Sequence, residues 1–163
     1  MLTAARIVET LALGLWLGSM VFLSFVVAPA AFAVLPSREL AGQLVGHTLA
    51  RLYLLGYVCG ALFLLALVVE QRLSGASLRA VALPIGLLAA MLLLIFCNQY
   101  FLGERLAALR TEMTATFGSI DQTPRDHALR AAFGRYHGVS ALLMLANMLL
   151  TLVLFVLTVR RFR

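Results

Sequence analysis

Four long apolar stretches constrain the fold of this chain more than any other feature of its sequence. Each is longer than the roughly 20 residues that an α-helix needs to cross about 30 Å of hydrocarbon. Because a bilayer offers no water to the backbone, each stretch must satisfy its peptide groups as a helix. The sequence therefore predicts an all-α integral membrane four-helix bundle that forms one domain over residues 1–163. The four predicted spans are about 7–29, 49–70, 80–102 and 137–159.

The composition excludes several classes of protein. The chain is 63% hydrophobic and 12% charged, whereas a soluble domain is about half apolar and roughly a quarter charged. One small core cannot bury so much apolar surface, so soluble enzymes, nucleic-acid-binding modules and disordered tails are excluded. The net charge of +6 comes from arginines, which collect where membrane-flanking segments meet anionic headgroups. The expected partner is therefore the lipid bilayer, and no nucleic acid.

The first apolar stretch has some features of a secretory signal. Arg6 precedes the stretch, and Ala31-Phe32-Ala33 imitates a cleavage site. However, the apolar run is well beyond the roughly 7–15 residues of a signal peptide, and Glu9 is atypical of one. We interpret the stretch as a membrane helix.

The connections between the spans are unequal. The second connection, Gln71–Arg79, is short and has Ser74-Gly75 as its turn. In the first connection, Ser37 is typical of an N-cap before Leu40. This predicts a helix that could run unbroken into the second span.

The third connection is predicted to be a helical hairpin. Apolar residues recur at helical spacing as far as Gly118, and Thr123-Pro124 is typical of a helix restart. Helices 2, 3 and 4 should therefore extend beyond the bilayer on one side, with an extramembrane helical hairpin at about 103–136. We call this side, which also holds residues 30–48, the crown side, and the opposite side the flush side.

Arginines indicate the orientation of the chain. Those of the flush side lie in short flanks, whereas those of the crown side are spread over longer segments and diluted with acids. The positive-inside rule then favours cytoplasmic N- and C-termini. Separately, we expect the chain to lie in the inner (plasma) membrane of a bacterium. The flush-side arginines are Arg6, Arg72, Arg79, Arg160, Arg161 and Arg163.

Small residues recur four positions apart in three of the spans. Such spacing lets membrane helices approach closely, because lipid offers no hydrophobic drive for their association. The pattern is compatible with packing inside one bundle, with a homo-oligomer seam, or with a larger membrane complex. The helix-packing candidates are Gly14, Gly18, Gly56, Gly60 and Gly86.

Polar residues at membrane depth predict a pocket near the crown-side boundary. On the last span they recur on one stripe, which begins at His137. Intramembrane polar groups are costly and usually face a bundle interior or a wet cavity. Each could instead form an interhelical hydrogen bond, meet headgroups or belong to an aromatic belt. The ligand-binding candidates are His137, Tyr136, Ser140, Asn98, His47, Arg51 and Asn147.

Soft metal ligands are present but form no motif. His137, Cys97 and Met144 could surround Cu(I), which favours imidazole, thiolate and thioether. No cofactor is otherwise predicted, and copper remains one alternative for the pocket. The sequence contains no catalytic triad, paired carboxylates or phosphate-binding loop, so it does not predict an enzyme.

Two segments of the chain form recognisable motifs. One is Phe133-Gly-Arg-Tyr-His-Gly-Val-Ser140, and the other runs from Trp16 through Pro29 to Phe32. Both segments resemble the transmembrane protein 205 family. The resemblance implies a small four-span membrane protein, distantly near the copper-resistance D proteins, and it supplies no mechanism. The matching motif positions are Pro29, Asn98, Tyr136, His137, Gly138 and Ser140.

Two functions remain open from the sequence. The first is binding or transport of a small ligand or metal ion through a polar pocket around His137. The alternative is a structural or accessory subunit that packs into a larger membrane complex through its glycine faces.

Overall fold

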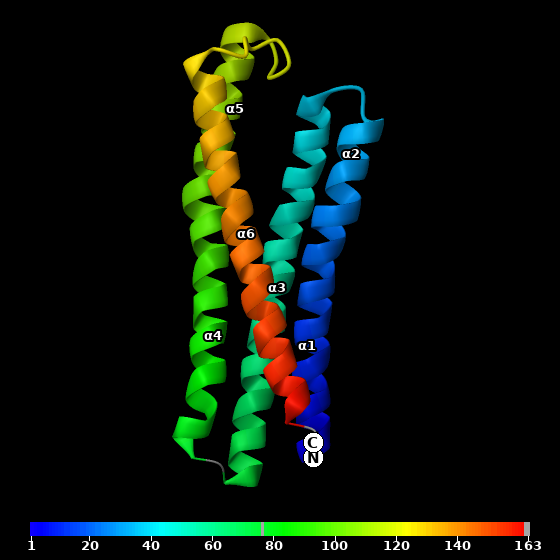
Figure 1. Ribbon diagram of the computed structural model, residues 1–163, viewed down its shortest axis with the longest axis vertical. Coiled ribbons are helices and arrows are strands. Elements are labelled where there is room, and N and C mark those ends of the chain that lie inside the picture. Colours follow the sequence, from blue (N-terminus) through cyan, green and yellow to red (C-terminus); the bar gives the residue numbers. More distant parts are fainter. Residues whose placement is uncertain (76, 162–163) are drawn as a thin grey trace.

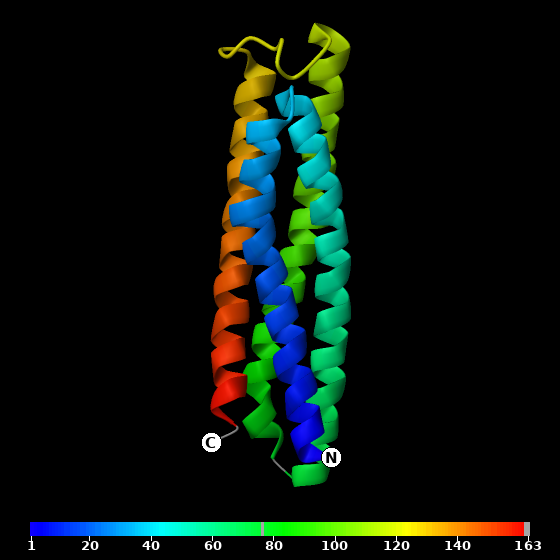
Figure 2. The same ribbon diagram turned by 90° about the vertical axis from the view of Figure 1, so that its right-hand side faces the viewer.

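Four long helical rods run along a common axis in the computed structural model, as Figures 1 and 2 show. The structure describes residues 1–75 and 77–161, except for the side chain of Leu78. Arg163, one of the predicted flush-side arginines, therefore lies outside the described residues. The first rod consists of α1 (Leu2–Phe22), the π-helix η1 (Leu23–Val27) and α2 (Ala28–Val34). The second is α3 (Arg38–Ser74). The third consists of α4 (Leu78–Phe96), the π-helix η2 (Cys97–Gly103) and α5 (Glu104–Phe117), and the fourth is α6 (Ala128–Arg160).

All four rods are long and apolar enough to cross a membrane. They contain 33 to 39 residues, which at 1.5 Å per residue corresponds to about 50–58 Å, well beyond the thickness of the hydrocarbon. This confirms the predicted all-α four-helix membrane bundle and indicates a multi-pass membrane protein. The first rod continues past Pro29 to Val34. Because proline has no N–H, Pro29 cannot donate to the carbonyl of Phe25, four residues earlier. Phe25 lies inside η1, where the helical turn is wider than in an α-helix.

The helix ends follow local side-chain chemistry. The Leu40 N–H donates to Ser37 Oγ at 3.1 Å, and α3 then runs unbroken through the second span, as predicted. Gly75 ends α3 with φ 65°, and Gly118 follows α5 with φ 84°. Both values lie in the left-handed region that glycine adopts without a steric penalty.

The predicted start of the last helix at Thr123-Pro124 is wrong. Instead, α6 begins at Ala128, where His127 Nδ1 accepts the Leu129 N–H at 3.3 Å. Thr123 is buried in the preceding loop, and its hydroxyl donates to the Ser119 carbonyl at 3.1 Å. That hydroxyl therefore stabilises the loop and is not a helix cap.

The core lies where α1, α3, α4 and α6 meet. Its largest fully buried side chains include Trp16, Phe63, Met91 and Leu154, one from each rod. Gly56 makes this packing possible, because a Cβ there would lie 2.7 Å from Ile95 Cδ1 and 2.9 Å from Trp16 Nε1. The close approach of α1 to α3 therefore depends on the missing side chain.

The other candidate glycines divide into two groups. A Cβ at Gly14 would meet Phe155 at 3.5 Å, and one at Gly60 would meet Leu92 at 3.1 Å. Both therefore face neighbouring helices. Gly18 and Gly86 are exposed, and no atom of the described residues lies within 4 Å of a Cβ built there.

Gly56→Ala and Gly18→Ala form a matched pair of substitutions inside long helices. At Gly56 we expect the free energy of unfolding to fall by about 1–2 kcal/mol, because overpacking costs about 1–3 kcal/mol and outweighs the helix propensity of alanine. At Gly18 we expect no loss. Thermal unfolding in detergent micelles measures both, and an equal effect at the two positions would contradict the packing described here.

Candidate functional site

A reciprocal pair of hydrogen bonds joins the third and fourth rods inside the bundle. Asn98 lies on η2 and Ser140 on α6, and both are buried. The Asn98 Nδ2 group donates to the Ser140 carbonyl oxygen at 3.0 Å, and Ser140 Oγ donates to Asn98 Oδ1 at 2.6 Å. The structure thus brings together two of the predicted ligand-binding residues, and their polar atoms bind each other.

A small cavity lies next to this pair. The volume open to the centre of a water molecule is about 10 Å³, which is close to the least that holds one water. All four rods contribute to its wall. The residues that matter for its chemistry are Trp16 and Met20 from α1, Tyr53 from α3, Asn98 from η2, and Met144 and Asn147 from α6.

Two polar atoms of this wall have no partner among the described residues. They are Tyr53 Oη and Asn147 Oδ1, and both are buried. The other end of the Asn147 amide is used, because Nδ2 donates to Met20 Sδ at 3.6 Å. A buried water needs two to four polar partners, so these two oxygens and the cavity could hold one molecule of that size.

The two π-helical segments lie at the same level of the bundle. Ser24 of η1 donates through Oγ to Met144 Sδ at 4.0 Å, and Asn98 of η2 binds Ser140. π-Turns are rare and occur frequently at functional sites. We therefore define the interior polar site as Tyr53, Asn98, Ser140 and Asn147 with their cavity.

Five of the seven predicted ligand-binding residues do not line this cavity, and one of them, Ser140, touches it only through its hydrogen bonds with Asn98. His137, His47 and Arg51 are exposed, and the His137 ring stacks on Phe133 with ring centroids 6.2 Å apart. Tyr136 is half-buried, with the Arg105 guanidinium 5.8 Å from its ring centroid. The structure therefore centres the interior polar site on Asn147, farther along α6 than His137.

The predicted copper ligands occupy different surroundings. Met144 lines the cavity, Cys97 is half-buried on η2, and His137 is exposed. Across residues 1–75 and 77–161, no three His, Cys, Asp or Glu side chains come together as metal ligands would. The copper site thus receives no support from a cluster of these donors.

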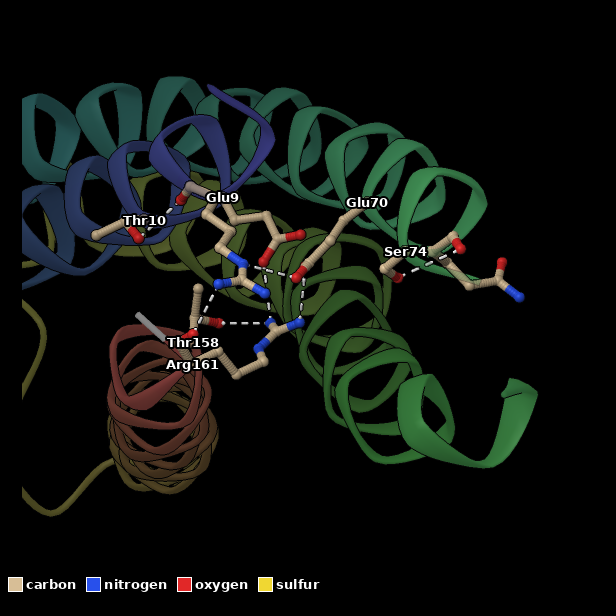
Figure 3. A network of polar contacts seen from close by, with 8 residues as sticks. Glu9, Thr10, Glu70, Ser74, Thr158 and Arg161 are labelled. Carbon is tan, nitrogen blue, oxygen red and sulfur yellow. Dashed lines mark hydrogen bonds and ion pairs between the residues drawn. The ribbon is translucent and has the colours of Figure 1, made fainter. Parts of the chain in front are cut away.

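A second polar cluster lies at the flush side, where Figure 3 shows it from close by. We call Arg6, Glu9, Glu70 and Arg161 the terminal ion cluster. Arg6 Nε donates to Glu70 Oε1 at 2.8 Å. Arg161 donates through Nη1 to Glu70 Oε2 at 3.1 Å and through Nη2 to Glu9 Oε2 at 2.9 Å. These are the three ion pairs among the described residues.

Further hydrogen bonds connect this cluster to the end of α6. Arg161 Nη2 also donates to Thr158 Oγ1 at 3.2 Å, and Arg6 Nη1 donates to the Arg161 carbonyl at 2.8 Å. The cluster therefore joins α1, α3 and the residue that follows α6. Sequence reasoning missed this cluster and treated Glu9 only as atypical of a signal peptide. The sequence feature that could have indicated this cluster is that each of two apolar spans carries a carboxylate near its flush-side end.

Arg161→Ala and Arg160→Ala test the terminal ion cluster with neighbouring arginines. The first removes a cation from two buried carboxylates, and we expect the free energy of unfolding to fall by about 2–4 kcal/mol. Arg160 is exposed and forms no ion pair in the described part of the chain, so its loss should cost less than about 0.5 kcal/mol. Equal losses in detergent unfolding would show that the cluster does not stabilise the bundle.

Comparison with known proteins gives a family but no activity. A protein-family model, described as a domain of unknown function (DUF4149), matches residues 11–115 of the chain. No curated protein and no solved structure matches the chain. The matched residues include Tyr53 and Asn98 but end before α6. The likeness to the transmembrane protein 205 family and the copper-resistance D proteins stays a prediction.

Proposed function

The chain belongs to the DUF4149 family, whose function is unknown, and we propose that it binds a small hydrogen-bond donor, of the size of water or ammonia, in the interior polar site. The observation that carries this proposal is the pair of unpartnered oxygens, Tyr53 Oη and Asn147 Oδ1, in the wall of one cavity. Binding or transport through a polar pocket was the first hypothesis from the sequence. The proposal keeps that class and moves its centre from His137 to Asn147.

The energetics of the unpartnered oxygens favour an occupant. Leaving a buried acceptor without a hydrogen bond costs about 1–3 kcal/mol, and a bilayer core supplies no water to reduce this cost. The Asn98 amide already exchanges hydrogen bonds with Ser140 through its Oδ1 and one of its N–H groups. An occupant that donates to Asn147 Oδ1 and accepts from the Tyr53 hydroxyl, as water or ammonia can, would recover the loss at both groups.

The size and chemistry of the wall restrict the occupant. A volume of about 10 Å³ for the centre of a water molecule leaves no room for a metabolite. Within the wall, one N–H of the Asn147 amide donates to Met20 Sδ, and the buried atoms without a partner belong to the Asn147 carbonyl, an acceptor, and to the Tyr53 hydroxyl, which both donates and accepts. The site therefore suits an occupant of one heavy atom that donates to Asn147 Oδ1. Ammonia or ammonium is the probe that differs least from water in size.

Thermal unfolding in detergent with ammonium chloride, compared with sodium chloride at equal ionic strength, tests this function. We expect ammonium to raise the Tm of the wild-type protein, because a ligand at 100 times its Kd stabilises by about 2.7 kcal/mol. Asn147→Leu and Tyr53→Phe should abolish the shift. Tyr100→Phe, at an exposed tyrosine, should keep it.

Methylammonium serves as the size control, and we expect no shift with it. A function in binding ammonia is contradicted if ammonium gives no shift in the wild type, because the site then holds a structural water that does not exchange for ammonia. It is also contradicted if Asn147→Leu retains the full shift.

A second candidate function, the structural or accessory subunit, has one observation in its favour. Gly18 and Gly86 are exposed on helices of the membrane-spanning segments, and each has open space where a side chain would be. Such positions allow another helix to approach closely. The partner would be a second copy of the chain or another membrane protein.

Native mass spectrometry from mild detergent tests the second candidate. If the exposed glycines form a seam, Gly86→Leu should reduce the oligomeric or complexed fraction of the protein at least several-fold. The matched substitution Ala80→Leu, at an exposed residue about 120° around α4 from Gly86, should have less effect. A monomer in both the wild type and Gly86→Leu would contradict this candidate.

We also propose a location in the cell and an orientation in the membrane. Arg72, Arg79 and Arg160 are exposed at the flush side, and short arginine-rich flanks favour the cytoplasmic side of a membrane. This supports an inner-membrane protein with both ends of the described chain on the cytoplasmic side.

A further inference from the structure

The terminal ion cluster contains one carboxylate oxygen that its arginines do not bind. The Glu9 side chain has 0% exposure, and its Oε2 accepts from Arg161. Its Oε1 is buried and has no hydrogen-bond partner among the described residues. A carboxylate carries acceptors only, whereas a protonated carboxyl has an O–H donor and less charge to solvate. The unpartnered oxygen is therefore the costly atom of an ionised Glu9.

A second carboxyl group lies next to Glu9. Glu9 Oε2 and Glu70 Oε2 bind the two terminal nitrogens of the same Arg161 guanidinium, at 2.9 and 3.1 Å. Figure 3 shows both carboxyl groups on one side of that guanidinium. Two ionised carboxylates so placed repel each other, and one proton bound to either of them removes the repulsion.

The charges of the two arginines equal those of two ionised carboxylates, so the charge count alone does not show whether Glu9 is protonated. The burial of the four side chains distinguishes the two cases. The Arg6 and Arg161 side chains are 32% and 29% exposed, whereas those of Glu70 and Glu9 are 9% and 0% exposed. The cations can therefore be solvated from outside the bundle, by water or lipid headgroups, and Glu9 cannot. If Glu9 is neutral, the one excess positive charge lies on the partly exposed arginines Arg6 and Arg161.

We propose that Glu9 and Glu70 form a proton-binding site at the flush side of the bundle, with the proton carried on Glu9 Oε1. The ligand is a single proton, and its release converts the cluster from a net charge of +1 to 0. Because Arg161 binds both carboxyl groups, a change of charge on Glu9 acts directly on the contact between α1, α3 and the end of α6.

The charged groups that face this site come from three elements. Arg6 lies on α1, Glu70 on α3, and Arg161 follows α6. The remaining element at this end is α4, whose Arg79 is exposed and forms no ion pair in the described part of the chain. The proton therefore interacts with one carboxylate and two guanidinium groups.

Infrared spectroscopy of the full chain in lipid vesicles tests the proposal. A protonated carboxyl group has a C=O stretch that is resolved from the bands of carboxylates and shifts in D₂O. We expect the wild type to show this band at neutral pH and to lose it as the pH is raised. Glu9→Gln should lack the band, while Glu104→Gln, at an exposed glutamate of α5, should retain it.

Thermal unfolding of the same variants provides an independent readout. Glutamine resembles a neutral glutamic acid, so Glu9→Gln should unfold within about 0.5 kcal/mol of the wild type at neutral pH. The proposal is overturned if the wild type shows no protonated-carboxyl band, or if the band survives in Glu9→Gln. A large loss of stability in Glu9→Gln would also overturn it, because Glu9 would then act as an ionised partner of Arg161.

Discussion

The hydrogen-bonding requirement of the hydrocarbon region governs this structure. In water an unpaired polar atom is solvated, but in a bilayer it must find its partner inside the protein. The backbone meets this requirement by forming four helical rods. Polar side chains meet this requirement by hydrogen-bonding to one another across the bundle, as Asn98 and Ser140 do through two hydrogen bonds. Atoms that remain unpaired in such a setting therefore indicate where something else binds.

Besides Arg110 Nε on α5, buried side-chain atoms without a partner among the described residues occur in two places that lie far apart along the bundle. In the middle, Tyr53 Oη and Asn147 Oδ1 line a cavity of about one water molecule. At the flush side, Glu9 Oε1 lies inside a cluster of four charges. The first place suits a small donor, and the second suits a proton. Both proposals follow from the same physical constraint, but each rests on its own contacts and each can fail alone.

Much of the fold was predictable from the sequence, because helix formation in a bilayer depends on local hydrophobicity. The four spans, the cap at Ser37 and the glycine ends at Gly75 and Gly118 are all local signals. The start of α6 was not predictable in this way. Thr123 has the chemistry of a cap, but the loop uses its hydroxyl for the Ser119 carbonyl.

The candidate site was predictable only in part. Ser140 and Asn147 were placed on one stripe of α6, and both are buried. His137 was placed on the same stripe, but successive residues turn by about 100° around a helix, which leaves it about 60° from Ser140. That angle is enough to turn His137 out of the interior, where the structure has it exposed. The terminal ion cluster joins residues as far apart as Glu9 and Arg161, and no local spacing reports such a contact.

The most direct measurement is an experimental structure of the wild-type protein at a resolution that shows ordered solvent. The account predicts density for one occupant between Tyr53 Oη and Asn147 Oδ1, within hydrogen-bonding distance of both. An empty cavity, or side chains turned so that each of these oxygens binds another group of the protein, would contradict it.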